Sequence, residues 1–245
     1  MIMRVRPLAA LPALAVLVAL LGGCGVPLLP PGQQATRSHQ VPDGVTGVRL
    51  EGRGDLQLST GPAALELTGG ENLLDDVRVE VDGSELVLSS DRRWQPQRRG
   101  TVTYRLTLPE WDAIRVSGSG SAVAEDAGDA ADSPLAVRVS GSGDLDLVGL
   151  DRRDVEVSVS GSGDVRLAGT ADSVRAEVSG SGDVRAGDLE ARDVSARVSG
   201  SGAVEVTATD SLSARVSGSG EVTYGGDPDR VDSSTSGSGS VRARR

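Results

Sequence analysis

Hydrophobic and polar residues alternate with a period of two from about Val45 to the end of the chain. The alternation passes through a motif, Ser-Gly-Ser-Gly, that occurs seven times. When the first serine of each motif is numbered zero, positions −5, −3, −1, +5 and +7 are mostly Val, Leu or Ala, whereas positions −2 and +4 are mostly polar. Such alternation predicts strands with one buried face. The motifs begin at Ser117, Ser140, Ser160, Ser179, Ser199, Ser217 and Ser236.

Successive motifs are 18 to 23 residues apart, and a period near 20 residues indicates one structural unit that is copied and stacked. Two all-β architectures fit. In a parallel β-solenoid, or β-helix, each repeat of about 20 residues forms one coil. In an antiparallel β-meander, Gly-Ser-Gly is a hairpin loop. We favour the solenoid because matching residues recur in columns and because the length varies only between position +7 and the next −5.

The parity of the pattern also predicts the orientation of the motif itself. Both glycines fall on odd positions and both serines on even ones, so we expect the glycines to point inward at a corner without room for a side chain. The segment 48–58 matches the repeat, with Glu51 and Arg53 in place of the serines, and is an eighth copy. The segments 76–83 and 101–106 alternate as well, but at irregular spacing, which is typical of longer or degenerate units.

The N-terminal residues predict export and a lipid anchor. Arg4 and Arg6 precede an apolar run, and the run ends in Leu-Gly-Gly followed by Cys24, the lipid acceptor of a bacterial lipoprotein signal. A transmembrane anchor and a plain signal peptide are the alternatives; the run is short for the former. We therefore expect a signal peptide at 1–23, a lipidated Cys24 with a Pro-rich flexible tether at 24–44, and one domain at 45–245 with regular repeats at 112–245.

Composition narrows the class of partner. Aromatic residues make up 2% of the chain and Phe is absent, which fits a thin core of Val, Leu and Ala. The net charge is −10, and loss of the two N-terminal arginines leaves 23 − 35 = −12. Nucleic acid is therefore not expected as a partner. Because Cys24 is the only cysteine, no disulfide is expected.

The residues offer little catalytic chemistry. His39 is the only histidine, so neither a Ser-His-Asp arrangement nor a zinc site is expected, and we predict no catalytic residues, no metal and no cofactor. Asp144, Asp164 and Asp183 share position +4 and could stack as Ca²⁺ ligands. Ala203 interrupts this column, and a solvated acidic row that suppresses edge association is the favoured interpretation.

Two segments are candidates for ligand binding. A basic loop on an otherwise acidic chain could hold a sugar acid or an anionic polymer, although an ordinary surface loop is the favoured alternative. Its candidate residues are Arg92, Arg93, Trp94, Arg98 and Arg99. The tripeptide Arg53-Gly54-Asp55 matches a host-receptor adhesion motif, but it also occupies repeat positions +2 to +4, so the fold already accounts for it.

The string Val-Ser-Gly-Ser-Gly-Asp-Val at 159–165, the Leu-Thr-Leu-Pro segment at 106–109 and the export signal resemble the family described as putative auto-transporter adhesin, head GIN domain. The resemblance extends from about Val45 to the end of the chain. It implies a right-handed β-helix-like fold and a cell-envelope location, and it supplies no catalytic residues that could be assigned to this chain. We expect a lipid-anchored envelope protein with a non-enzymatic, adhesin-like domain that binds a glycan or an envelope protein. A structural spacer or sensor-associated domain is the alternative, and a glycan-active enzyme is less favoured.

Overall fold

The computed structural model describes residues 33–90, 100–125 and 132–244. The predicted signal peptide, Cys24 and the basic-loop residues Arg92, Arg93, Trp94, Arg98 and Arg99 lie outside these ranges. No helix within the described ranges is long and apolar enough to cross a membrane.

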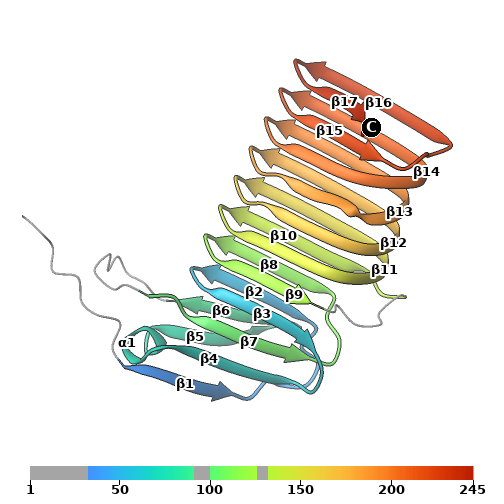
Figure 1. The fold of residues 1–245 in the computed structure, drawn as a ribbon. Helices are drawn as coiled ribbons and strands as arrows, with labels where there is room; N and C mark the ends of the chain where they lie inside the picture. Colours follow the sequence, from blue (N-terminus) through green and yellow to red (C-terminus); the bar gives the residue numbers. More distant parts are fainter. Residues whose placement is uncertain (1–32, 91–99, 126–131, 245) are drawn as a thin grey trace, which may run out of the picture.

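The described residues form a parallel β-solenoid with repeats of about 20 residues (Figure 1). Each regular coil contributes a strand to a first face, turns at the Ser-Gly-Ser-Gly motif, and contributes a strand to a second face. From β11 onward one long strand contains the second-face part of one coil and the first-face part of the next. The first face contains β2 (Gly47–Gly52), β6 (Glu85–Ser90), β8 (Ala113–Gly118), β10 (Leu135–Gly141), β16 (Arg230–Gly237) and the later parts of the long strands. The second face contains β3 (Asp55–Thr60), β7 (Thr103–Leu108), β9 (Ser121–Glu125), β15 (Glu221–Gly225), β17 (Ser240–Ala243) and the earlier parts of the long strands. The long strands are β11 (Asp144–Gly161), β12 (Val165–Gly180), β13 (Val184–Gly200) and β14 (Ala203–Gly218).

The strand register confirms the solenoid and shows that the meander alternative was wrong. Ser140 pairs with Ser160, Ser160 with Ser179, and Ser179 with Ser199, all between parallel strands. Register shifts occur between Leu147 and Leu150, between Arg166 and Ala168, and after Ala186, that is, around or after position +7, close to the link in which the sequence length varies.

The core is thin and is filled by the predicted columns. Val178 and Val198 are buried side by side at position −1, and Ala176, Ala196 and Ala214 are buried at position −3. Small residues in the same column let the two faces of the solenoid pack close to each other. The low aromatic content therefore has a direct structural cause, because a core this narrow needs few large side chains.

The two glycines of each motif have different roles, which corrects the expectation that both point inward. Gly182 is buried, and a Cβ there would overlap the carbonyl oxygen of Gly163 and lie 2.9 Å from Cγ1 of Val159. Gly180 is only half-buried and has a φ of +131°, a left-handed conformation that L side chains rarely adopt. The first glycine makes the turn, and this turn breaks the alternation that parity alone predicts.

The coils at the N-terminal end do not stack in chain order. The β2–β3 coil lies between the β6–β7 coil and the β8–β9 coil, because β2 pairs with both β6 and β8, and β3 with both β7 and β9. After β3 the chain forms β4 (Ala64–Gly70), the short helix α1 (Glu71–Leu74) and β5 (Val77–Asp82) at the end of the stack (Figure 1). Antiparallel pairing of β4 with β7 and of β5 with β6 explains the irregular spacing of these segments.

The flexible tether predicted at 24–44 ends earlier in the structure than the predicted boundary at residue 44. Strand β1 (Gln34–His39) pairs antiparallel with β4, so ordered structure begins before Val45. Ala35 and Val41 pack against the core, and Arg37 forms a 2.6 Å ion pair with Asp75. The strand was not predicted from the sequence because the residues at its inward positions are small or charged rather than large and apolar.

Candidate functional site

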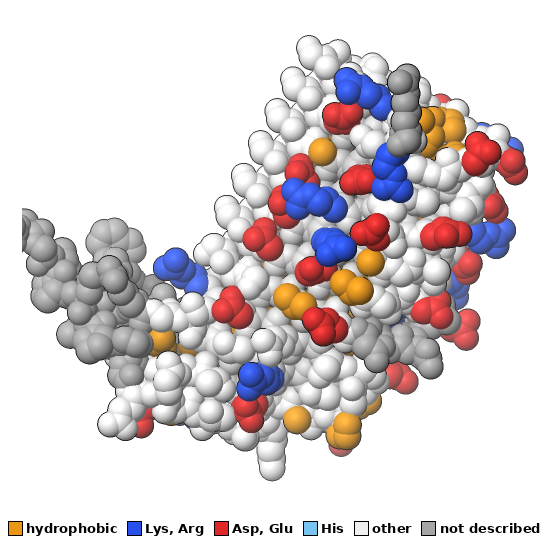
Figure 2. Space-filling view, in the orientation of Figure 1, with side chains coloured by type: hydrophobic (Ala, Val, Ile, Leu, Met, Phe, Trp, Pro, Cys, Tyr) orange, Lys and Arg blue, Asp and Glu red, His pale blue; other side chains and the backbone are white. Residues whose placement is uncertain are grey.

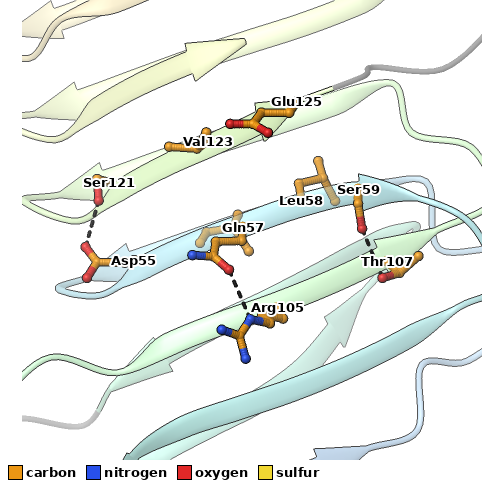
Figure 3. Close-up of a pocket in the computed structure, with 10 residues that line it drawn as sticks. Asp55, Gln57, Leu58, Ser59, Arg105, Thr107, Ser121, Val123 and Glu125 are labelled. Atoms are coloured by element: carbon orange, nitrogen blue, oxygen red, sulfur yellow. Dashed lines mark hydrogen bonds between the residues drawn. The ribbon is translucent and has the colours of Figure 1, made fainter. Parts of the chain in front are cut away.

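A groove of about 560 Å³ lies on the second face near the N-terminal end of the stack (Figure 3). Strand β3 runs through its middle, with β7 on one side and β9 on the other. On each of the three strands, every second residue points out of the sheet into the groove. The lining consists of Asp55, Leu56, Gln57, Leu58, Ser59, Arg105, Thr107, Ser121, Val123 and Glu125, of which Leu56 and Leu58 are buried core residues.

The strand register sets the rows of the groove. Gln57 on β3 pairs with Arg105 on β7 and with Val123 on β9, so these three side chains form one row across the strands. Asp55 and Ser121 form the neighbouring row. Because paired positions on adjacent strands lie close to each other, the first row brings groups from three different coils together and the second row groups from two.

Hydrogen bonds within each row fix the polar side chains. Ser121 Oγ donates to Asp55 Oδ1 at 2.7 Å, and Arg105 Nε donates to Gln57 Oε1 at 3.1 Å (Figure 3). Arg105 also contacts Glu66 on β4 through Nη1 at 3.3 Å. Since the oxygen of Gln57 already accepts a bond from Arg105, its amide group is the part left to donate to a ligand.

The far row of the groove is built from hydroxyls. The Oγ of Ser59 and the Oγ1 of Thr107 lie 3.1 Å apart and share a hydrogen bond. Val123 is the lining residue with the most exposed apolar side chain, 40% accessible. The ten lining residues include neither a histidine nor an aromatic ring. The groove thus offers hydroxyl, amide, carboxylate and guanidinium groups held in place, which suits ligand binding by hydrogen bonds.

The acidic column at position +4 has a structural role. The backbone N–H of Asp164 donates to Asp144 Oδ1 at 3.2 Å, that of Asp183 to Asp164 Oδ1 at 3.2 Å, and that of Ala203 to Asp183 Oδ1 at 3.0 Å. Arg185 bridges Asp164 and Asp183 at 2.9 and 3.1 Å, and the bond to Asp164 raises the pKa of Arg185. Each carboxylate therefore holds the next coil. Within the described residues no group of three or more His, Cys, Asp or Glu could hold a metal ion.

The Arg53-Gly54-Asp55 tripeptide lies at the corner between β2 and β3. Gly54 is buried with a φ of +150°, and Asp55 is bonded to Ser121 at the edge of the groove. The motif thus belongs to the coil, as the repeat predicted, and Asp55 also belongs to the groove. The rest of the groove was missed because its strands are separated in the chain and adjacent only through the unusual coil order.

An ion cluster lies on the first face of the same three coils. Glu85 on β6, which is 8% exposed, accepts bonds from Arg49 on β2 at 2.6 and 3.1 Å and from Arg115 on β8. Gly47 lies between them, and a Cβ there would be 3.0 Å from Cγ of Glu85. The missing side chain lets Glu85 reach across β2. The bond to Glu85 raises the pKa of Arg49.

A buried cation fills a corner of the core. Arg152 is 2% exposed, and its guanidinium carbon lies 4.9 Å from the ring centroid of Trp111, a cation–π geometry. Burial lowers the pKa of Arg152, and Asp112 and Asp151 oppose this shift. The equivalent position in the next coil is Ala171, so the large pair occupies space that the regular coils do not have.

Comparisons with known proteins identify a matching family and solved structures with a similar fold. The family model described as putative auto-transporter adhesin, head GIN domain matches residues 45–228. The crystal structure of a putative adhesin from Bacteroides fragilis is 25% identical with a TM-score of 0.78, and the alignment covers 88% of this chain and 100% of that one. A putative lipid binding protein from Parabacteroides distasonis is 24% identical with a TM-score of 0.69, covering 89% and 99%. A putative adhesin from Parabacteroides merdae is 19% identical with a TM-score of 0.65, covering 89% and 99%. No curated protein matches the chain.

Proposed function

We propose that this chain, which belongs to the putative auto-transporter adhesin, head GIN domain family, is an exported cell-envelope lipoprotein whose solenoid is a non-enzymatic binding domain. The observation that supports binding most directly is the groove on β3, β7 and β9. Its polar groups are already held by cross-strand bonds such as Arg105 to Gln57. A ligand would therefore lose little free energy to the ordering of side chains on binding.

The lipid anchor rests on Cys24 and the residues before it. Ten residues of chain lie from Gly25 to Gln34, where β1 begins, so the start of β1 stays within about 35 Å of the lipidated residue. The groove belongs to the coils nearest that end. An anchored protein would thus present the groove close to its own membrane rather than far from the cell.

The anchor has a direct test. Cys24→Ala should abolish labelling with radioactive palmitate and release the protein from the membrane fraction. A Ser38→Ala variant, changed in the exposed part of β1, should be labelled and retained like the wild type. Retention of the Cys24→Ala protein in membranes would disprove the lipoprotein assignment.

The binding function is tested on purified exported protein in detergent. Immobilised protein should retain material from envelope extracts, and this material should elute with excess soluble protein. Capture of a single protein instead would favour the alternative, a spacer or sensor-associated domain. Retention of nothing would refute a binding domain. Since Asp55 and Glu125 are both carboxylates, and glycosidases use two, release of reducing sugar from bound glycans would overturn the non-enzymatic assignment.

A further inference from the structure

We propose that the groove binds a glycan, a polyhydroxylated chain that is uncharged or bears amines, laid along the axis of the solenoid. This inference rests on the proposed binding function and adds the class of ligand. It follows from the direction of the groove, from its hydrogen-bonding groups and from its charge.

The direction of the groove favours a long ligand. The row Arg105, Gln57 and Val123 crosses three adjacent strands, with one side chain from each (Figure 3). Adjacent strands are about 4.8 Å apart, so the lining groups repeat at that interval along the stack. A chain molecule lying along this axis meets a new set of polar groups at each strand.

The available groups suit hydroxyls. Ser59, Thr107 and Ser121 offer hydroxyls, the amide of Gln57 offers donors, and Asp55 offers a second carboxylate oxygen beside the one bonded to Ser121. Sugars present alternating donors and acceptors of this kind. A hydrogen bond to a charged acceptor such as Asp55 is also stronger than one between neutral groups.

The charge of the groove disfavours acidic polymers. Its lining contains two carboxylates, Asp55 and Glu125, and one guanidinium, Arg105, which already contacts Gln57 and Glu66. The whole chain has a net charge of −10. A polyanion would therefore be repelled and ammonium groups attracted, whereas the net charge neither repels nor attracts uncharged hydroxyl groups.

The lining also disfavours a lipid or a protein surface. Acyl chains need a continuous apolar wall, and the exposed apolar surface here centres on Val123. Protein interfaces depend on buried aromatic and apolar anchors, and no aromatic residue is among those that line the groove. Figure 2 shows that the face turned to the viewer is largely polar, with acidic and basic side chains interspersed.

The test uses the exported protein in detergent with three oligosaccharide probes: chitin fragments (neutral), chitosan fragments (amine-bearing) and polygalacturonate fragments (acidic). Val123→Arg fills the groove and adds a cation. Thr223→Arg is the matched control. Thr223 lies in the same column of the second face as Val123, because strand pairing connects the two residues through positions 146, 166, 185 and 205 in successive coils. Binding is measured by calorimetry, and folding of each variant by circular dichroism.

We expect chitin or chitosan fragments to bind and polygalacturonate not to bind. Val123→Arg should weaken binding by about tenfold or more, and Thr223→Arg should change it by less than about twofold. Should Val123→Arg misfold, Gln57→Ala provides the same test with a loss of one donor. Tight binding of polygalacturonate, or equal binding by folded Val123→Arg and wild type, would overturn the glycan assignment.

The result is separable from the proposed function. If none of the three probes binds but envelope material is still retained, the binding domain stands and the glycan assignment falls. If neither probes nor envelope material bind, the proposed function falls as well.

Discussion

The second glycine of the motif gives the sharpest test of the fold. Gly182→Ala adds one methyl group at a buried corner where the nearest atoms belong to the carbonyl of Gly163, one coil away, and to Val159. A backbone atom cannot rotate aside, so the coils must separate locally. This separation lengthens the 3.0 Å bond from the N–H of Gly182 to the carbonyl of Gly161. Overpacking of this kind costs about 1–3 kcal/mol, and a weakened backbone bond adds about 1 kcal/mol.

Two control variants isolate this cause. Gly187→Ala also introduces a methyl group at a glycine of the second face, but there the nearest atoms are the flexible ends of Arg244 and Glu205, at 2.6 and 2.7 Å. Ser181→Ala changes the exposed residue next to Gly182. Both should stay within about 1 kcal/mol of the wild type, because side chains can move and surface changes are mild.

The assay is urea unfolding followed by far-ultraviolet circular dichroism. Gly182→Ala should lower the free energy of unfolding by about 3 kcal/mol and the two controls by much less. Equal stability of Gly182→Ala and Gly187→Ala would refute the reasoning, since it would mean that the motif corner has room for a side chain.

Two further variants probe the buried charges. Glu85→Ala leaves the guanidinium groups of Arg49 and Arg115 without their shared acceptor, and because both arginines are partly exposed we expect a loss of about 1–3 kcal/mol in urea unfolding; an unchanged midpoint would show that the cluster does not join the coils. Arg152→Ala removes the cation–π contact with Trp111 and leaves a cavity, so we expect a loss of about 2–4 kcal/mol. Arg152→Met should recover most of this loss by packing alone, and failure to recover it would show that the charge itself is needed.

The regular part of the fold was predictable because one constraint acts on every coil. Parallel stacking places equivalent positions in contact, so the Val at −1 of one repeat must suit the Val at −1 of the next, and the columns appear directly in the sequence. The same logic recovered the copy at Glu51 to Gly54, which in the structure pairs with Ser117 to Gly120. The columns of equivalent residues carry no information about the backbone angle φ, so the left-handed turn at Gly180 and its equivalents was not predicted.

The N-terminal end was less predictable because its order in space differs from its order in the chain. Alternation marked 76–83 and 101–106 as strands, but nothing local indicates that β3 lies between β7 and β9. The groove depends on that placement. Strand β1 was missed for a different reason: it pairs through its backbone with β4 and buries little apolar surface, so its sequence has no strong period.

The coil order and the candidate site are physically connected. The β2–β3, β6–β7 and β8–β9 coils contribute the ion cluster on the first face and the groove on the second, and each of the three cluster residues comes from a different coil. A coil inserted out of chain order is not joined to its stack neighbours by one short link, so its register depends on strand pairing and on side-chain contacts. The cluster at Glu85 supplies such contacts, and the rows that align Gln57 with Arg105 and Val123 depend on the same register. Loosening the cluster should therefore disturb the groove from the opposite face, and Glu85→Ala should weaken ligand binding although Glu85 does not line the site.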